Sequence, residues 1–179
     1  MKNNPKQLLA ESELIHSAQA ITQAIEKLAV EIEKALGQSN PLVMCVMGGA
    51  VVFSGQLLPH LAFPLAFDYV QASRYHGETQ GTEITWRVQP TENVKGRTIL
   101  LLDDILDEGH TLAAIREKCL ALGALDVKIA VLVEKTLNKQ KPVKADFVGL
   151  SVPNRYVFGC GMDVYGWWRN LPSIHALKE

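Results

Sequence analysis

The segment that decides the fold is Thr98-Ile-Leu-Leu-Leu-Asp-Asp-Ile-Leu-Asp-Glu-Gly-His-Thr-Leu112. Its apolar run, Ile99 to Leu102, is typical of a strand that is buried on both faces inside a parallel sheet. The strand is predicted to end at two acids, Asp103 and Asp104, and a short loop then leads to an amphipathic helix from Thr111 to Leu122. Because ligands bind beyond the carboxyl ends of strands in open α/β sheets, we expect a binding site at this edge.

The polar residues of this segment suit a phosphorylated sugar. Carboxylates at Asp103, Asp104 and Asp107 can accept hydrogen bonds from sugar hydroxyls or bind a hard cation. Gly109 and Thr111 stand at the start of the helix, whose first N–H groups attract phosphate. A solvated acidic turn at a helix N-terminus would explain one or two of the acids. It does not explain three acids together with Gly and Thr in this order, so we interpret the segment as a ligand site.

Length and composition indicate one globular domain. The chain has 179 residues, of which 47% are hydrophobic and 21% are charged, as is ordinary for a folded protein. Its 18 Lys and Arg residues against 19 Asp and Glu residues leave a formal net charge of −1. Broad capture of nucleic acid needs a basic face, so we expect no nucleic-acid partner, although a local basic pocket is compatible with this balance.

Cysteine spacing and the N-terminal segment favour a cytoplasmic location for the protein. Cys45, Cys119 and Cys160 lie far apart and are interpreted as small core residues, which predicts a reducing compartment and no structural zinc. The N-terminus leads into an amphipathic segment rather than a signal peptide. The most apolar run, Leu42 to Phe53, is broken by glycines and is too short to span a bilayer. We therefore expect a cytoplasmic protein without a membrane partner.

Outward from the central segment, strands and helices alternate. Apolar residues three and four apart predict a helix over 12–36, with Ser12 as its N-cap and Gly37 as its stop. The strands over 64–71 and 83–89 should pair antiparallel around a mobile loop at 72–82. The remaining predicted elements are strands over 42–47, 127–133 and 147–150 and a helix over 50–60. This order predicts an α/β fold with a doubly wound parallel sheet, and the aromatic-rich tail from Pro153 is a candidate lid or hood.

Two segments resemble one known family. The central segment matches, in register, the phosphoribosyl-diphosphate signature of type I phosphoribosyltransferases of the hypoxanthine–guanine kind. The segment Val152-Pro-Asn-Arg-Tyr-Val-Phe-Gly-Cys-Gly-Met-Asp163 resembles the purine-binding hood of the same enzymes. The resemblance extends from about Val43 to Pro172 and implies a parallel sheet flanked by helices, a small hood subdomain and a flexible antiparallel loop. It implies a single domain over 1–179, with a core at about 38–150 and a hood built from the N-terminal segment and about 151–179.

The resemblance assigns the central residues to the phosphorylated sugar. Asp103 and Asp104 would bind the ribose 2′- and 3′-hydroxyls, with Mg²⁺ nearby, and Asp107 would be the general base that takes the proton from purine N7. The 5′-phosphate would be held by backbone N–H groups and a hydroxyl of the loop formed by Glu108, Gly109, His110 and Thr111. Glu108 stands where the family usually has Thr or Ser, so we expect its backbone, and not its carboxylate, to bind phosphate.

The same resemblance assigns a diphosphate loop and a mobile catalytic loop. Met47 and Gly48 would give backbone N–H groups to the diphosphate, a contact that the family often makes through a cis peptide bond. Met47 stands where many relatives have lysine, so only backbone contacts are expected from it. Ser73, Arg74 and Tyr75 would form the catalytic loop that closes over the reacting centre and excludes water, with Arg74 in place of the usual serine.

The purine would be recognised by a residue that follows the predicted strand over 127–133 and by residues of the aromatic-rich tail. By resemblance, Lys135 would donate a hydrogen bond to the 6-oxo group, Tyr156 would stack on the base, and Val157 would contact it through its backbone. Asp163 would be a Mg²⁺ ligand on the diphosphate side, and Arg169 would reach the diphosphate. The other tail aromatics are interpreted as packing residues, namely Tyr165, Trp167 and Trp168.

The implied activity is transfer of the phosphoribosyl group of phosphoribosyl diphosphate to N9 of a 6-oxopurine, which yields IMP or GMP and diphosphate in purine salvage. Mg²⁺ is the implied cofactor. Two alternatives stay open here: a helical isoprenyl-diphosphate enzyme, because Asp103-Asp104-x-x-Asp107 also fits its motif, and a regulator that senses phosphoribosyl diphosphate without turnover. The preference among hypoxanthine, guanine and xanthine is left open, as is the choice between a homodimer and a homotetramer, for which the exposed face of the first two helices is a natural interface.

Overall fold

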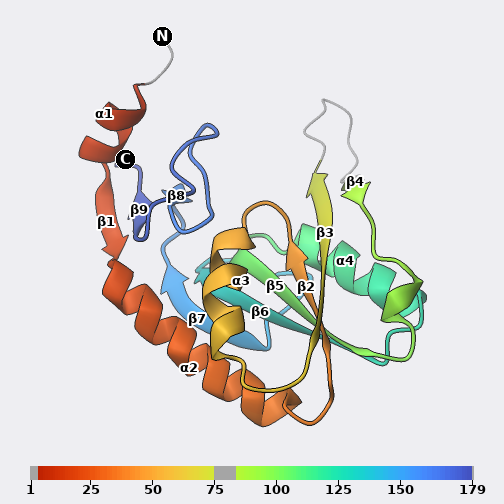
Figure 1. The fold of residues 1–179 in the computed structure, drawn as a ribbon. Coiled ribbons are helices and arrows are strands. Elements are labelled where there is room, and N and C mark those ends of the chain that lie inside the picture. The colour runs from red at the N-terminus through yellow and green to blue at the C-terminus, as the bar shows by residue number, and fades with distance from the viewer. Residues whose placement is uncertain (1–3, 75–83, 179) are drawn as a thin grey trace.

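The computed structural model describes residues 4–74 and 84–178, which form two sheets and their covering helices (Figure 1). The main sheet has the strand order β4-β3-β2-β5-β6-β7, and the small sheet has the order β1-β9-β8. Along the chain the elements are α1 (Pro5–Ala10), β1 (Glu13–His16), α2 (Ala18–Leu36), β2 (Leu42–Val46), α3 (Val51–Leu57), η1 (Leu58–His60), β3 (Ala66–Arg74), β4 (Ile84–Val88), η2 (Glu92–Val94), β5 (Thr98–Leu106), α4 (His110–Ala121), β6 (Asp126–Lys135), β7 (Phe147–Val152), β8 (Val157–Phe158) and β9 (Ile174–Ala176).

The main sheet is parallel except at one edge. β2 pairs in parallel with β3 and β5, and β6 pairs in the same way with β5 and β7. β4 pairs antiparallel with β3, which confirms the pairing predicted for these two strands. The loop expected between them falls largely on residues 75–83, outside the described residues. The parallel order brings the carboxyl ends of β2, β3, β5 and β6 to one edge of the sheet, where the predicted site residues stand.

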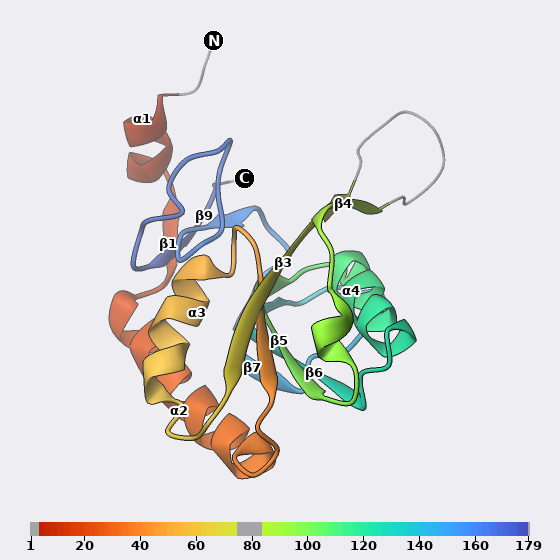
Figure 2. The ribbon, with the colours of Figure 1, turned by 45° about the vertical axis from the view of Figure 1, so that its right-hand side comes forward.

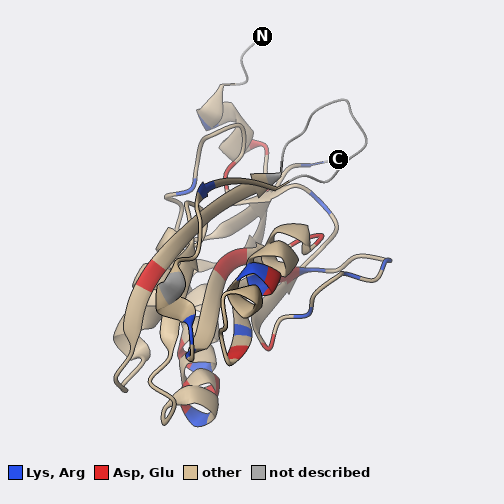
Figure 3. Cartoon of the chain, turned by 90° about the vertical axis from the view of Figure 1, so that its right-hand side faces the viewer, with Lys and Arg blue, Asp and Glu red and all other residues tan. Residues whose placement is uncertain are grey.

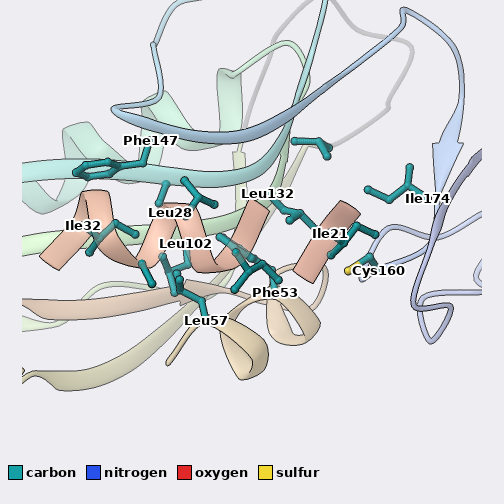
Figure 4. Packing of buried hydrophobic residues seen from close by; sticks show 14 of the residues in the cluster. Ile21, Leu28, Ile32, Phe53, Leu57, Leu102, Leu132, Phe147, Cys160 and Ile174 are labelled. Carbon is teal, nitrogen blue, oxygen red and sulfur yellow. The ribbon is translucent and has the colours of Figure 1, made fainter. Parts of the chain in front are cut away.

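Helices cover both faces of the main sheet. α2 and α3 lie on one side and α4 on the other (Figure 2). α2 is amphipathic and buries Ile21, Ile25, Leu28 and Ile32 in the apolar cluster shown in Figure 4. A second cluster contains residues of α4, among them Leu112. Because a fully buried Leu or Ile side chain contributes about 1.5–3 kcal/mol, these two layers hold the site-bearing edge in place.

The helix predicted over 12–36 is wrong at its start. Residues 13–16 form β1, which pairs antiparallel with β9 at the other end of the chain. α2 begins at Ala18 behind Ser17, whose Oγ accepts a hydrogen bond from the Ala20 N–H at 3.2 Å. The helical spacing of apolar residues continues through 13–16, but backbone pairing with a distant strand prevails over it there. Gly37 is the C-cap of α2, as predicted.

The central strand is longer than predicted. β5 does not end at Leu102 but continues through the acid pair to Leu106, because its ladder with β6 continues to the pair Leu106–Glu134. Asp103 and Asp104 therefore project from a hydrogen-bonded strand, which fixes their backbone. An acid motif on a strand of a parallel sheet also contradicts the isoprenyl-diphosphate alternative, which requires an all-helical protein.

The small sheet joins the N-terminal segment to the aromatic tail. β1 and β8 both pair antiparallel with β9. Arg155 donates from Nη1 to Glu13 Oε2 at 2.6 Å and from Nη2 to the Leu177 carbonyl at 2.7 Å, and Trp168 Nε1 donates to the Pro5 carbonyl at 2.7 Å. These bonds anchor the tail as a hood, which lies near the edge of the main sheet to which β2 and β3 point (Figure 1). The boundaries at about 38 and 150 stay a prediction.

The three cysteines are buried, as their interpretation as core residues predicts. Burial raises the pKa of Cys119 and of Cys160 to about 11. Both thiols are therefore protonated and poorly nucleophilic near neutral pH.

The charge distribution is mixed. Positive and negative residues are interspersed along the chain in the view of Figure 3. None of the helices in residues 4–74 and 84–178 is long and apolar enough to cross a bilayer.

Candidate active site

Two adjoining cavities open at the carboxyl edge of the main sheet. The larger, of about 640 Å³, is lined by the β2–α3 turn, parts of β3 and β4, the end of β5 and the start of α4. The smaller, of about 250 Å³, is lined by β5, Lys135 and the hood from Tyr156 to Arg169. Asp104, Asp107 and Arg169 line both cavities. The two spaces suit two ligand parts that meet at the acids of the central segment.

The acid pair is largely withdrawn from water. Asp104 is only 7% exposed, and its N–H donates to Asp103 Oδ1 at 3.0 Å. Burial, and then the charge of Asp104, raise the pKa of Asp103 well above its usual range. Burial also raises the pKa of Asp104, but hydrogen bonds and the nearby Arg169 charge oppose this rise. A ligand that brings hydroxyl donors or a cation would favour the charged form of the pair.

Two glycines allow the hood to lie directly on the acid pair. A Cβ atom on Gly49 would lie 2.0 Å from Asp104 Oδ2, and one on Gly161 would lie 2.1 Å from the Gly49 carbonyl oxygen. Gly161 also has φ of +104°, which L side chains rarely adopt. The β2–α3 turn, the Asp104 carboxylate and the hood backbone thus form one tight contact, which the sequence did not predict.

The β2–α3 turn has the backbone that the resemblance implied. The Met47–Gly48 peptide bond is cis, and the Met47 N–H donates to the Val70 carbonyl at 2.8 Å. Met47 and Gly48 both line the larger cavity. The Met47 side chain is an uncharged thioether, whose sulfur accepts a weak hydrogen bond from the Cys45 thiol at 3.9 Å. It therefore brings no charge to the cavity.

Asp107 and Lys135 meet where the two cavities join. Lys135 Nζ lies 2.6 Å from Asp107 Oδ2, and the Lys135 side chain is only 12% exposed, so Lys135 is no solvated surface charge. Asp107 follows β5 and Lys135 ends β6, and the two strands are neighbours. The resemblance assigned both residues to the purine independently, and the structure brings them into contact.

The loop between β5 and α4 is shaped for an anion. Gly109 has φ of +84° and N-caps α4, whose first N–H groups have no partner within the helix. His110 and Thr111 start the helix and line the larger cavity. Glu108 forms an ion pair with Lys139. Its carboxylate therefore has a cationic partner, which agrees with the expectation that only its backbone serves phosphate.

On the hood side, Arg169 is held in a fixed position. Its Nη2 donates to Asp163 Oδ1 at 2.5 Å, and its Nη1 donates to the Gly161 carbonyl at 2.6 Å. Asp163 Oδ2 accepts a hydrogen bond from the Gly166 N–H at 2.8 Å. Val157 is buried and lines the smaller cavity. The predicted Mg²⁺ ligand thus holds the residue that was predicted to reach the diphosphate.

The interpretation of the other tail aromatics as packing residues is wrong for two of three. Tyr165 is 61% exposed and stacks on Tyr156, with ring centroids 6.3 Å apart and an angle of 19° between the planes. Trp167 is 55% exposed, and only Trp168 is partly buried. Positive φ angles at Tyr165 and Trp168 turn the chain here, and Gly166 between them is the one residue type in this stretch that predicts such a turn.

The acids fit a magnesium ion that is shared with a ligand. In the described part of the chain, no three His, Cys, Asp or Glu side chains gather as a metal site. The roles of Asp103, Asp104 and Asp163 as Mg²⁺ ligands stay predictions. Mg²⁺ commonly binds to one or two carboxylates together with phosphates of a substrate. The hard oxygens of Asp103 and Asp104 beside an anion-binding loop match that pattern.

The predicted catalytic loop is only partly described. Ser73 lies on β3 and lines the larger cavity. Arg74 ends β3 and pairs with Ile84, while Tyr75 lies outside the described residues. The roles of these three residues stay predictions.

Two cations of the site were missed in the sequence. Arg87 of β4 lines the larger cavity. Lys141 donates to the Leu106 carbonyl at 3.0 Å, the Lys135 carbonyl at 2.7 Å and Glu134 Oε1 at 3.0 Å. The only sequence signal for Lys141 was the basic, proline-containing connection after β6.

The architecture is that of an α/β protein with two adjoining cavities at the carboxyl edge of its parallel sheet. Comparison with known proteins shows to which family the chain belongs. The family model described as "Phosphoribosyl transferase domain" matches residues 11–165, so the chain belongs to the phosphoribosyltransferase family.

Relatives match over most of the chain. The hypoxanthine-guanine phosphoribosyltransferase of Streptococcus pneumoniae strain R6 is 34% identical over 160 residues, which are 89% of each chain. The hypoxanthine-guanine-xanthine phosphoribosyltransferase of Tritrichomonas foetus is 34% identical over 167 residues, 93% of this chain and 91% of its own. A solved structure of a hypoxanthine-guanine-xanthine phosphoribosyltransferase matches with a TM-score of 0.82 and 32% identity, over 93% of this chain and 97% of the other. The fold predicted from the resemblance is thus confirmed.

Proposed function

We propose that this protein transfers the 5-phosphoribosyl group of phosphoribosyl diphosphate to N9 of hypoxanthine or guanine, which yields IMP or GMP and diphosphate in purine salvage. The observation that carries the proposal is the 2.6 Å contact between Asp107 and Lys135 at the junction of the two cavities. This pair offers one acceptor and one donor side by side. A 6-oxopurine presents the matching N7–H donor and O6 acceptor on one edge.

The larger cavity takes phosphoribosyl diphosphate in this proposal. Asp103 and Asp104 accept hydrogen bonds from the ribose hydroxyls, and the loop of Glu108, Gly109, His110 and Thr111 holds the 5′-phosphate. Met47, Gly48 and Arg169 bind the diphosphate. Asp103, Asp104 and Asp163 would hold Mg²⁺, which would lower the negative charge of the diphosphate. Ser73, Arg74 and Tyr75 cover the reacting centre.

The smaller cavity takes the base. Tyr156 stacks on the purine, the Val157 backbone contacts its edge, and Lys135 donates to O6. The bond between C1 of the ribose and the diphosphate oxygen breaks, a bond from C1 to N9 forms, and the N7 proton goes to Asp107. The chain therefore acts by positioning the two substrates and by stabilising developing charge.

The Asp107–Lys135 pair also favours 6-oxopurines over adenine. Adenine has a 6-amino group, which cannot accept a hydrogen bond from the Lys135 ammonium. Lys135 is largely buried, so the mismatch leaves a charged donor without a partner. Discrimination by an unmatched buried polar group is stronger than discrimination by shape.

The proposal includes a cytoplasmic location and a homodimer or homotetramer. Two exposed apolar residues, Leu14 on β1 and Val30 on α2, are available for contacts between subunits. Analytical ultracentrifugation of the purified protein measures the oligomeric state directly.

The first experiment is a turnover assay. The protein is incubated with Mg²⁺, phosphoribosyl diphosphate and one of hypoxanthine, guanine, xanthine or adenine, and nucleotide formation is followed. We expect turnover of hypoxanthine or guanine and none of adenine. Tight binding of phosphoribosyl diphosphate without turnover of any base would overturn the proposal in favour of a regulator.

A further inference from the structure

We propose that Arg87 binds the diphosphate half of phosphoribosyl diphosphate, an inference that rests on the proposed function. Arg87 lies on β4 and lines the larger cavity together with Gly48 and Ser73. The residues assigned to the diphosphate so far come from the β2–α3 turn and the hood. Arg87 adds a cation from a different wall of the same cavity.

A β-bulge directs Arg87 toward this site. Gln71 of β3 pairs with Val88, but the next residue, Ala72, pairs with Trp86. Arg87 is therefore an extra residue on β4 between two ladder pairs. Bulges are common next to active sites, where they redirect a side chain. Trp86 packs against the apolar cluster that contains α4, and Val88 is paired with Gln71. The strand is therefore held on both sides of a solvent-accessible Arg87.

Arg87 differs from the other two cations of the cavities in its ion pairing. Lys135 is paired with Asp107, and Arg169 is paired with Asp163. Arg87 makes neither an ion pair nor a side-chain hydrogen bond within residues 4–74 and 84–178. Its guanidinium is thus available to an anionic ligand in a cavity that is lined by several acids, and its planar set of donors suits phosphate oxygens.

The strand order decides which phosphate Arg87 serves. β4 lies beside β3, and β3 lies beside β2, which leads into the Met47–Gly48 turn. The loop predicted to hold the 5′-phosphate follows β5, on the other side of β2. Arg87 therefore stands on the side of the cavity where the diphosphate is proposed to bind.

Calorimetry with the full chain and Mg²⁺ tests this assignment with three ligands: phosphoribosyl diphosphate, inorganic diphosphate and GMP, which has a 5′-phosphate but no diphosphate. We expect Arg87→Gln to weaken binding of the first two by about tenfold to a hundredfold, the usual effect of losing hydrogen bonds between charged groups. GMP binding should be unchanged. Arg87→Lys should restore part of the affinity, because it keeps the charge but loses the planar donor geometry.

Arg116→Gln is the matched control. Arg116 is an exposed arginine on α4 that lines neither of the two cavities, so its removal makes the same change in net charge. At about 0.15 M salt, charges more than about 8 Å away are largely screened, and this variant should bind all three ligands as the wild type does. Thermal melting of each variant checks that it is folded.

Wild-type affinity for both diphosphate ligands in Arg87→Gln would overturn the inference. An equal loss of GMP affinity would also overturn it, because Arg87 would then serve the 5′-phosphate. A wild-type protein that binds none of the ligands would overturn the proposed function itself, and that result needs no variant.

Discussion

The Asp107–Lys135 pair shows how single residues can combine recognition and chemistry. Each side chain is the other's partner at 2.6 Å, and each needs a new partner when a purine enters between the cavities. In the proposed function, a 6-oxopurine would satisfy both at once, since N7–H would replace the ammonium for Asp107 and O6 would replace the carboxylate for Lys135. The exchange would leave the carboxylate able to accept the N7 proton when C1 becomes electron-poor.

Asp107→Ala should abolish most turnover and leave the affinity for phosphoribosyl diphosphate nearly intact, because Asp107 is proposed to serve the base and not the sugar. Asp107→Asn is the conservative partner variant, since it keeps size and hydrogen bonding but cannot accept the N7 proton. Steady-state kinetics with guanine and calorimetry with phosphoribosyl diphosphate measure the two properties. Equal turnover in the Asp107→Ala variant and the wild type would exclude Asp107 as the base.

Asp103 is a residue whose placement opposes stability. Burial and the charge of Asp104 raise its pKa, so between the unfolded pKa of about 3.9 and the raised value the folded chain binds more protons than the unfolded chain. Stability therefore falls as pH rises through this window. Asp103→Asn should raise Tm by about 2–4 °C at pH 8, which corresponds to a gain of roughly 1 kcal/mol in unfolding free energy, and it should not change Tm at pH 4. Glu117→Gln, at an exposed position on α4, is the control in thermal melts; a gain of equal size at both pH values would contradict the explanation.

At the scale of elements, the ends of β5 and β6 are joined by a lysine. Lys141 gives all three ammonium donors to the Leu106 carbonyl, the Lys135 carbonyl and Glu134, and its side chain is only 10% exposed. Leu106 precedes Asp107, and Lys135 is the proposed purine donor. Lys141 therefore fixes the backbone beside both members of the Asp107–Lys135 pair, and it lines neither of the two cavities.

Lys141→Met should raise KM for the purine and lower kcat, while the affinity for phosphoribosyl diphosphate changes little. The methionine keeps the apolar stem but leaves two carbonyls without their charged donor. Lys144→Met, in the same connection but more exposed, is the matched control. If Lys141→Met lowers Tm but leaves KM and kcat as in the wild type, Lys141 has a structural role only and does not position the Asp107–Lys135 pair.

Sequence patterns predicted the elements whose burial is local and missed those that depend on distant pairing. The apolar run at 99–102 marked the central strand, but its extension to Leu106 depends on the ladder with β6. β1 was hidden in a helical pattern because its partner, β9, lies at the other end of the chain. In the site, Asp107 and Lys135 could be named from motifs, whereas Arg87 could not, because its position depends on a bulge in the register of two strands.

At the scale of the whole molecule, the hood and the main sheet share an apolar cluster, and at one point the hood backbone lies directly on the β2–α3 turn. Gly161 of the hood lies over the Gly49 carbonyl, and Gly49 in turn lies over the Asp104 carboxylate. This contact sets the distance between the hood, where the base is proposed to bind, and the carboxyl edge of the main sheet, where the sugar is proposed to bind. A change in it should therefore affect both stability and the use of both substrates together.

Gly161→Ala tests this contact, with Gly166→Ala as a control that separates two effects. Both glycines have positive φ, +104° and +87°, but a Cβ on Gly161 would lie 2.1 Å from the Gly49 oxygen, whereas one on Gly166 would meet no atom within 4 Å. The positive φ alone should lower the unfolding free energy by about 1–2 kcal/mol in each variant. The overlap should lower it by about 1–3 kcal/mol more in Gly161→Ala and reduce kcat/KM for both substrates. Urea unfolding and steady-state kinetics measure these effects. Equal losses of unfolding free energy and of kcat/KM in the two variants would show that the hood can shift to accommodate the added Cβ. The Gly161–Gly49 contact would then not determine the distance between the hood and the sheet.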